Sequence, residues 1–178
     1  MKRAFIHIGG VIFLLAAWGF SVTDSSAQYI HFSMTVEPEL SADVVQNLDF
    51  GTYTINSGIQ NVSKGNPNMG IFQIRALSNQ HLLVTLNTPE HLIHSDPNID
   101  SRIPIRLNAS YTNNGVQDVE QSIPMTDNQA WFPIGDQRVN GSSARRETAY
   151  IYIYGQVESG NVLQGDYVGQ LVLNVEYY

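Results

Sequence analysis

The residues best suited to binding a metal ion cluster near the middle of the chain. His91 and His94 precede Asp96, and oxygen-bearing side chains recur at every second position from Asp96 to Asp100. Imidazole nitrogens suit zinc, and carboxylate oxygens suit calcium. A hand-type calcium loop also needs a glycine at its sixth position and a closing glutamate, and this run has neither. We predict no metal site and no cofactor, while a metal at Asp96 to Asp100 stays open.

Recognisable catalytic motifs are missing from the sequence. With no Cys, a thiolate nucleophile, a zinc-thiolate site and a disulfide are all excluded. There is no Gly-x-Ser-x-Gly elbow, no phosphate-binding glycine loop and no dinucleotide fingerprint. Asp49, Asp136 and Glu147 could meet in space as a glycosidase pair would, but surface solubility explains them better. We therefore expect a protein that is not an enzyme.

Three tyrosines offer a surface for binding rather than for catalysis. Tyr150, Tyr152 and Tyr154 alternate along one predicted strand, which places their rings about 7 Å apart on one face. If that face is exposed, the stripe can stack against sugar rings or the aromatic groups of a partner. If it is covered, the rings pack as core. Core or cross-strand packing is the favoured interpretation.

Charge narrows the choice of partners further. The 178 residues include 9 Lys and Arg against 16 Asp and Glu, a net charge of -7 with a pI near 5.0. Nucleic acids and anionic membranes are bound through clusters of positive charge. We accordingly expect no nucleic-acid partner and no binding to an anionic membrane surface.

The first 27 residues have the organisation of an export signal. Lys2 and Arg3 precede a mostly apolar run from Ala4 to Phe20, and small residues end the stretch at Ser25-Ser26-Ala27. We predict a signal peptide over 1–27, cleaved on the Sec pathway, and a single mature domain over 28–178. The protein would then be secreted, extracellular or on the cell surface, with the periplasm as an alternative. A single membrane anchor is a weaker reading because about 17 apolar residues barely span a bilayer.

Alternation of apolar and polar residues recurs throughout the mature chain and predicts an all-β protein. No window of a dozen residues shows the apolar stripe of a helix. We expect an antiparallel, immunoglobulin-like sandwich of two sheets with about seven to nine strands. Its predicted strands include 29–37, 48–55, a hairpin of 72–76 with 82–86, 103–111, 119–123, 131–134, 148–157 and 168–178.

The first predicted strand, 29–37, has two interpretations. Its apolar side chains share one face: Ile30, Phe32, Met34 and Val36. Such a strand can be donated to an open groove of a neighbouring subunit. It can equally close the sandwich of its own chain. The second interpretation needs no partner and is the favoured one.

Two stretches carry a resemblance to a known family. Leu48-Asp49-Phe50-Gly51-Thr52 resembles the Leu-x-Phe-Gly motif of secreted bacterial domains labelled domain of unknown function 4402. The C-terminal stretch from Gly165 to Tyr177 resembles the Gly-x-Tyr-x-Gly ending of that family, which pilins and spore-coat U domains share in kind. The residues that match are Leu48, Phe50, Gly51, Gly165, Tyr167, Gly169 and Tyr177.

This resemblance implies a pilin-like, immunoglobulin-like secreted module without a catalytic site. The function it implies is that of a structural or adhesive surface protein, with a fimbria-like subunit as its most specific form. The alternative is a β-sandwich module that binds carbohydrate or protein. Self-association, other surface subunits and glycans are the partners expected from these two readings.

Overall fold

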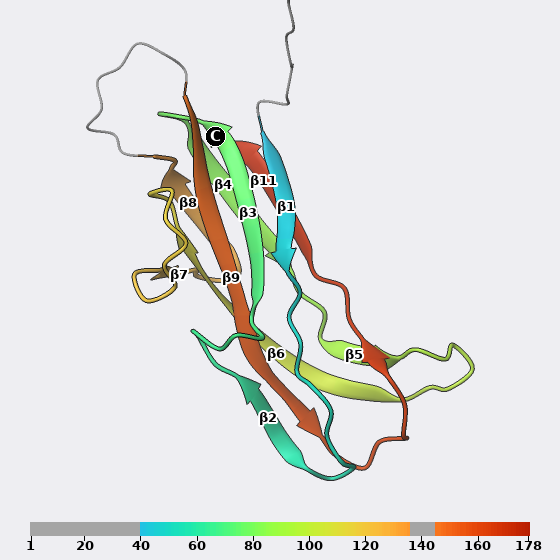
Figure 1. The fold of residues 1–178 in the computed structure, drawn as a ribbon. Helices are drawn as coiled ribbons and strands as arrows, with labels where there is room; N and C mark the ends of the chain where they lie inside the picture. The colour runs from blue at the N-terminus through green and yellow to red at the C-terminus, as the bar shows by residue number, and fades with distance from the viewer. Residues whose placement is uncertain (1–39, 136–144) are drawn as a thin grey trace, which may run out of the picture. The chain divides into compact units, whose positions relative to one another are not determined.

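Residues 40–135 and 145–178 are described by the computed structural model, and they form eleven β-strands without any helix (Figure 1). Eight strands belong to one antiparallel sheet and three to a second. The prediction of an all-β, antiparallel, two-sheet fold is confirmed. In this part of the chain no helix is long and apolar enough to cross a membrane.

The larger sheet contains, from edge to edge, β1 (Ser41–Gln46), β3 (Gly70–Leu77), β9 (Arg146–Ser159), β6 (Arg102–Thr112), β5 (His91–His94) and β10 (Tyr167–Val168). Off this path, β2 (Gly58–Val62) pairs with β9, and β7 (Ile123–Pro124) pairs with β6. The smaller sheet consists of β11 (Val172–Tyr177), β4 (His81–Asn87) and β8 (Gln129–Pro133), with β4 in the centre. All described residues belong to one unit, Glu37–Tyr178.

Strand β9 is the central strand of the larger sheet. One of its edges pairs with β6, from Ile105↔Val157 to Thr112↔Tyr150. Its other edge pairs first with β3 and then with β2, which takes over from Gly155 to Ser159. Because its two edges pair with β6, β3 and β2, β9 fixes the relative positions of these three strands.

The main core lies between the two sheets. The larger sheet contributes alternate residues of β3, β6 and β9, and the smaller sheet contributes alternate residues of β4 and β8. Its buried members are Ile74, Ala76, Leu82, Val84, Leu86, Ala109, Ala130, Phe132, Ile134, Ala149, Ile151 and Ile153. Burying an Ile or Leu side chain contributes about 1.5–3 kcal/mol, so this cluster is the principal source of stability.

The predicted hairpin of 72–76 with 82–86 is wrong. Strand β3 pairs with β1 and β9, whereas β4 pairs with β11 and β8 in the other sheet. The turn at Ser78–Gln80 therefore carries the chain across the core as an arch. Asn79 has a positive φ of 62° in this turn. The alternation of apolar and polar residues cannot distinguish a hairpin from an arch, because both place Ile74 and Leu82 on a buried face.

Two predicted strands differ from the observed ones near the motif residues. Residues 47–55 are not a strand, and β1 and β2 flank them on either side. The predicted strand 168–178 is divided, since β10 pairs with β5 in the larger sheet and β11 pairs with β4 in the smaller one. The chain changes sheets at residues 169–171, so one continuous strand is impossible there.

The two long central strands of the larger sheet, β6 and β9, match the predictions best. β6 and β9 contain the predicted runs 103–111 and 148–157 and extend beyond them. Of 119–123 only Ile123 is in a strand, and 131–134 corresponds to β8. The eleven strands exceed the predicted seven to nine because β1, β2 and β5 were not predicted and because 168–178 is divided into β10 and β11. These unpredicted strands have only 4 to 6 residues each. Such short strands leave little periodicity in a sequence.

Truncating the core should cost far more than truncating the surface. We expect Ile151→Ala to lower the free energy of unfolding by about 2–5 kcal/mol because it leaves a cavity in a fully buried site. Ile59→Ala is the matched control, since Ile59 also lies in a strand but is 60% exposed, and should cost below about 1 kcal/mol. Urea unfolding of both variants measures the difference, and equal losses would contradict the assigned core.

Candidate functional site

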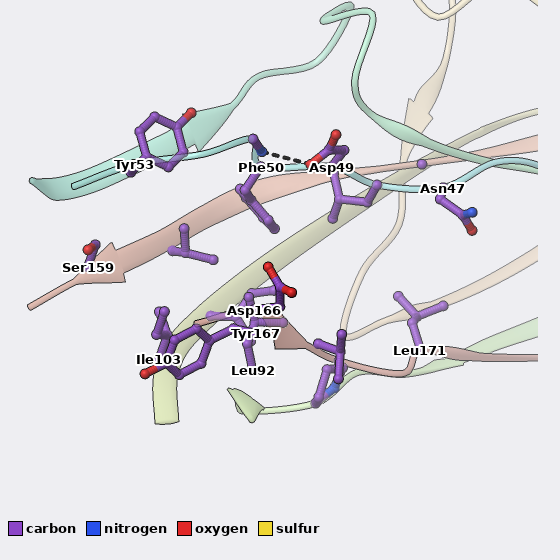
Figure 2. Close-up of a pocket in the computed structure, with 18 of the residues that line it drawn as sticks. Asn47, Asp49, Phe50, Tyr53, Leu92, Ile103, Ser159, Asp166, Tyr167 and Leu171 are labelled. Carbon is purple, nitrogen blue, oxygen red and sulfur yellow. Dashed lines mark hydrogen bonds between the residues drawn. The ribbon is translucent and has the colours of Figure 1, made fainter. Parts of the chain in front are cut away.

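A groove of about 950 Å³ opens where the smaller sheet no longer covers the larger one (Figure 2). The inner face of β6 and β9 forms its apolar floor, with Ile103, Ile105, Leu107, Ile153 and Val157. The segment 46–55, which begins at the end of β1, lines one side, and the segment 162–171, which contains β10, lines the other. This volume lies in the range of about 300–1,000 Å³ that is usual for binding pockets.

The residues of the two sequence motifs meet at this groove. Leu48, Phe50 and Gly51 lie on one side of it, and Gly165, Tyr167 and Gly169 lie on the other. Phe50 and Tyr167 both pack on the same buried residues of the floor: Ile103, Ile105 and Val157. Tyr177 lies elsewhere, on β11, where its hydroxyl accepts a hydrogen bond of 3.2 Å from the backbone N–H of Leu77. Six of the seven motif residues therefore build one structural site.

Asp49 shapes the first side of the groove. Its Oδ1 accepts a hydrogen bond of 2.7 Å from the backbone N–H of Gly51. Gly51 has a φ of +83°, a conformation in which glycine has no steric penalty. The bend diverts the chain from a regular strand and turns the Phe50 ring onto the floor. This local bond explains why the alternating residues 48–55 fail to form the predicted strand.

Tyr167 anchors the second side. Its hydroxyl donates a hydrogen bond of 2.8 Å to the carbonyl of Leu163. Because the one hydroxyl proton of Tyr167 is used in that bond, the Ser101 hydroxyl donates the hydrogen bond of 2.6 Å between the two oxygens. The ring packs edge to face on His94, with the two centroids 5.2 Å apart. These contacts hold the segment before β11 against β5 and leave the opposite edge of that segment facing the groove.

His94 is fully engaged in the same structure. Its Nδ1 accepts a hydrogen bond of 3.0 Å from the backbone N–H of Asp96, so the ring proton resides on Nε2. That proton points to the carbonyl of Gln164 at 3.3 Å. The motif residue Gly165 lies so close that a Cβ built on it would be 2.0 Å from Nε2. His94 therefore acts as a structural residue that only a glycine can approach.

The residues weighed for metal binding do not form a joint site. His91 is exposed and His94 is buried, because residues three apart on β5 face opposite sides of the strand. The carboxylate of Asp96 accepts two hydrogen bonds of 2.9 Å from Asn98, one from the backbone N–H and one from the side-chain amide. These bonds hold the pKa of Asp96 below its usual value. The described residues contain no cluster of three or more potential ligands.

The two described carboxylates that were weighed for catalysis, Asp49 and Glu147, are not brought together. Asp49 borders the groove, whereas Glu147 pairs with Ala76 near the start of β9, six residues before the part of that strand that forms the groove floor. Asp136 lies outside the described residues. Among the described residues that line the groove, only Asp49 and Asp166 carry a charge. Asp49 already uses one oxygen for the bend at Gly51.

Both sides of the groove present backbone groups without a strand partner. In the described part of the chain, the backbone N–H groups of Phe50, Thr52 and Tyr53 donate no hydrogen bond to a neighbouring strand. Residues 169–171 likewise lie between β10 and β11 and belong to neither. An apolar floor between two unpaired borders suits an extended polypeptide segment with alternating apolar side chains.

The three tyrosines of β9 do not form an exposed stripe. Tyr152 is fully buried, in a second cluster with Val62, Met69 and Ile71 on the outer face of the larger sheet. Tyr150 and Tyr154 are half-buried beside it. A continuous stacking surface on these rings is therefore excluded, because its central ring offers no face to a ligand. Core and cross-strand packing, the favoured interpretation of the sequence, describes the three rings.

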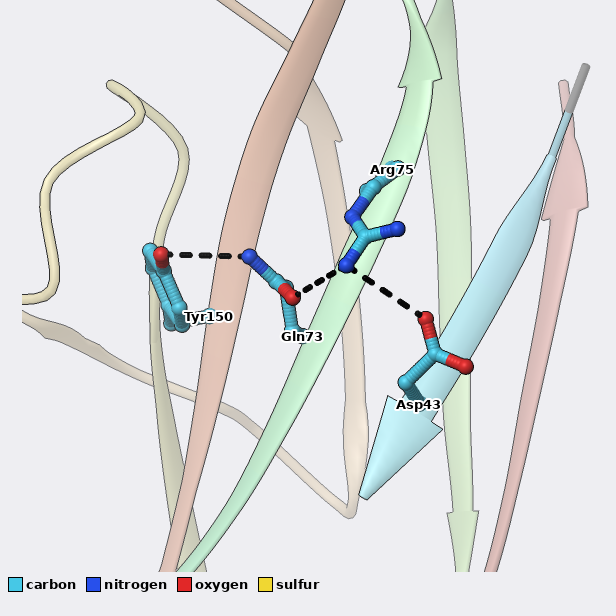
Figure 3. A network of polar contacts seen from close by, with 4 residues as sticks. All are labelled: Asp43, Gln73, Arg75 and Tyr150. Atoms are coloured by element: carbon cyan, nitrogen blue, oxygen red, sulfur yellow. Dashed lines mark hydrogen bonds and ion pairs between the residues drawn. The ribbon is translucent and has the colours of Figure 1, made fainter. Parts of the chain in front are cut away.

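Tyr150 instead ends a polar ladder across three strands (Figure 3). Gln73 on β3 donates a hydrogen bond of 3.3 Å to the Tyr150 hydroxyl and accepts one of 3.0 Å from Arg75. Arg75 also lies 4.0 Å from the carboxylate of Asp43 on β1. Such exposed pairs contribute little to stability, so the ladder mainly aligns the edge strand β1 with β3 and β9.

The predicted strand with Ile30, Phe32, Met34 and Val36 lies outside the described residues, as does the predicted signal peptide 1–27. The nearest described residue, Leu40, packs on the main core. It is followed directly by β1, the edge strand that leads into the groove. Whether the strand is donated or retained stays a prediction.

No family model matches the chain, and no curated protein matches it. The groove, the two sheet faces and the composition of the sequence are therefore the features that bear on function.

Adding a methyl group at Gly165 should destabilise the groove wall. We expect Gly165→Ala to lower the free energy of unfolding by about 1–3 kcal/mol, since the new Cβ would overlap His94 and the φ of +154° suits glycine alone. Gly160→Ala is the control, because a Cβ there meets no atom within 4 Å, and we expect a change below about 1 kcal/mol. Thermal and urea unfolding compare the two, and an unaffected Gly165→Ala would refute the described contact.

Buried tyrosines should make the fold sensitive to alkali. Burial raises the pKa of Tyr152 and Tyr111 above the usual 10.0. The unfolded chain therefore releases these protons first, so their contribution to stability is complete below pH 10 and is lost as pH rises above it. Tyr152→Phe should reduce the loss of stability between about pH 9 and pH 11, measured by urea unfolding. Tyr178→Phe, at a ring that is 81% exposed, should leave it unchanged.

Proposed function

We propose that this protein is a secreted, non-enzymatic structural or adhesive surface protein that works as a fimbria-like subunit. The observation that carries the proposal is the groove, with its apolar floor between two borders of unpaired backbone. A site of this kind binds an extended segment by adding a strand. Backbone hydrogen bonds then supply affinity, and alternate side chains in pockets supply specificity.

The occupant that fits this site is the N-terminal segment 29–37 of a second copy. Its four apolar residues alternate, as a strand lying on the groove floor requires. Seven extended residues from Ile30 to Val36 span roughly 23 Å. Donation of this strand from copy to copy joins subunits, whereas retention in the same chain closes a monomer.

Export and the lack of reactive groups support the same role. The basic and apolar residues of 1–27 have the order of a signal peptide. A negative net charge and the absence of Cys are compatible with a soluble surface domain that folds without disulfides. The histidine beside the groove has both ring nitrogens in structural hydrogen bonds, and one groove carboxylate holds a bend. The resemblance of the motif stretches to secreted structural domains points the same way.

The experiment measures assembly of the exported protein by light scattering during gel filtration and by electron microscopy. We expect concentration-dependent oligomers or filaments. Phe32→Asp should prevent them because it places a charge on the face directed to the groove floor. Ser33→Asp is the matched control on the opposite face of the same strand and should assemble normally.

A second pair of variants tests the receiving site. Ile55 lines the groove and is 48% exposed, whereas Ile59 lies on β2 away from it and is 60% exposed. Ile55→Asp should raise the dissociation constant of assembly by about tenfold or more, and Ile59→Asp should not. A strictly monomeric protein at high concentration, or equal behaviour within both pairs, would refute the proposal of a donated strand.

A further inference from the structure

The outer face of the smaller sheet carries an ordered set of rings and polar side chains. The buried residues of β4, β8 and β11 point to the core, so the alternate residues point outward. In register across all three strands, these outward residues form three rows: Tyr178, His81 and Pro133; Glu176, Leu83 and Trp131; and Asn174, Thr85 and Gln129. Val172 and Asn87 continue the same face on β11 and β4 alone. One end of the face is therefore aromatic and the other end carries amide and hydroxyl groups.

The aromatic end is built around Trp131. The His81 ring stacks on the indole, with centroids 4.7 Å apart and planes inclined by 19°. Tyr178 meets the indole edge to face, with centroids 6.2 Å apart. Despite these two neighbours, Trp131 is 54% exposed and Tyr178 is 81% exposed. The rings thus support one another and still leave aromatic surface open to a ligand.

The strand that carries Trp131 is fixed by a tight turn. Asp127 and Asn128 have φ values of 51° and 59°, and Thr126 and Gln129 exchange backbone hydrogen bonds of 2.9 and 3.1 Å around them. Two successive positive φ values are typical of a type I′ turn, which matches the twist of the strands that it joins. The turn sets Gln129 and Trp131 in place before any ligand arrives, which lowers the entropic cost of binding.

Rings beside amides suit a carbohydrate better than a protein. A sugar ring has an apolar face of C–H groups, which packs on an indole, and a rim of hydroxyls that both donate and accept hydrogen bonds. Asn174 and Gln129 offer both a donor and an acceptor, as do hydroxyls such as that of Thr85. The core of a protein interface is depleted of charged residues, whereas Glu176 lies in the central row of this face. The Glu176 carboxylate and the net charge of -7 favour a neutral sugar over an acidic one.

We propose that the outer face of the smaller sheet binds a neutral polysaccharide, with Trp131 as the stacking surface and the row of Asn174, Thr85 and Gln129 as its polar contacts. The inference rests on the surface role proposed above and names the ligand class of its adhesive form. The two proposals can be refuted independently. Assembly is tested by the oligomeric state of the protein, whereas this site is tested by its binding of saccharides.

Tryptophan fluorescence reports on this site directly. The sequence has two tryptophans, and Trp18 lies in the predicted signal peptide 1–27, so the exported and cleaved protein contains Trp131 alone. We expect a soluble neutral polysaccharide, from a panel of β-glucan, xylan, mannan and dextran, to shift the emission and to protect the indole from quenching by acrylamide. The same polysaccharide should retard the protein in an affinity gel.

Variants in the affinity gel assign the contacts. Trp131→Ala should weaken retention by about tenfold or more, and Gln129→Ala with Asn174→Ala should weaken it to a smaller degree. Ile93→Ala is the control, since Ile93 has the same exposure of 54% but lies on β5. The proposal is overturned if all four polysaccharides leave the fluorescence unchanged or if Trp131→Ala retains full binding. It is also overturned if Trp131→Ala alters only the oligomeric state, which would identify a protein interface.

Discussion

The smaller sheet is shorter than the sheet that it covers, and this mismatch determines the rest of the structure. β9 has 14 residues and β6 has 11, whereas β4, β8 and β11 have 7, 5 and 6. The half of the larger sheet beyond Ile153 must therefore be covered by other parts of the chain. Phe50, from the irregular segment 47–55, and Tyr167, from the two-residue strand β10, cover part of it with large rings. Their incomplete cover leaves the groove.

Local sequence patterns predicted the central strands and failed where the partner of a strand decides its role. β6 and β9 are long and rich in β-branched and aromatic residues, so their periodicity sufficed. The arch at Ser78–Gln80 and the change of sheet at residues 169–171 depend on pairing between distant strands. Alternation is identical in a hairpin and an arch. The meeting of Phe50 and Tyr167 at one groove had no local signal, although each motif was visible in the sequence.

The two aromatic sets show how position in a sheet changes the role of similar residues. Tyr152 lies on the central strand β9, with neighbours on both edges and a second cluster above it, and is fully buried. Trp131 lies on β8, at an edge of the smaller sheet, and remains 54% exposed. Both alternate with apolar residues in the sequence. Periodicity identifies the face of a strand, and only the fold tells whether another layer covers that face.

The two ends of the described sandwich lie beside one turn. Ser41 pairs with Arg75 just before Ser78–Gln80, and the backbone N–H of Tyr178 donates to the carbonyl of His81 just after it. A tension that pulls these two points apart would load the hydrogen bonds of the edge strands β1 and β11 one after another. It would peel both strands at low force. A strand held in the groove and pulled along its own axis would instead load its bonds together and resist by shear.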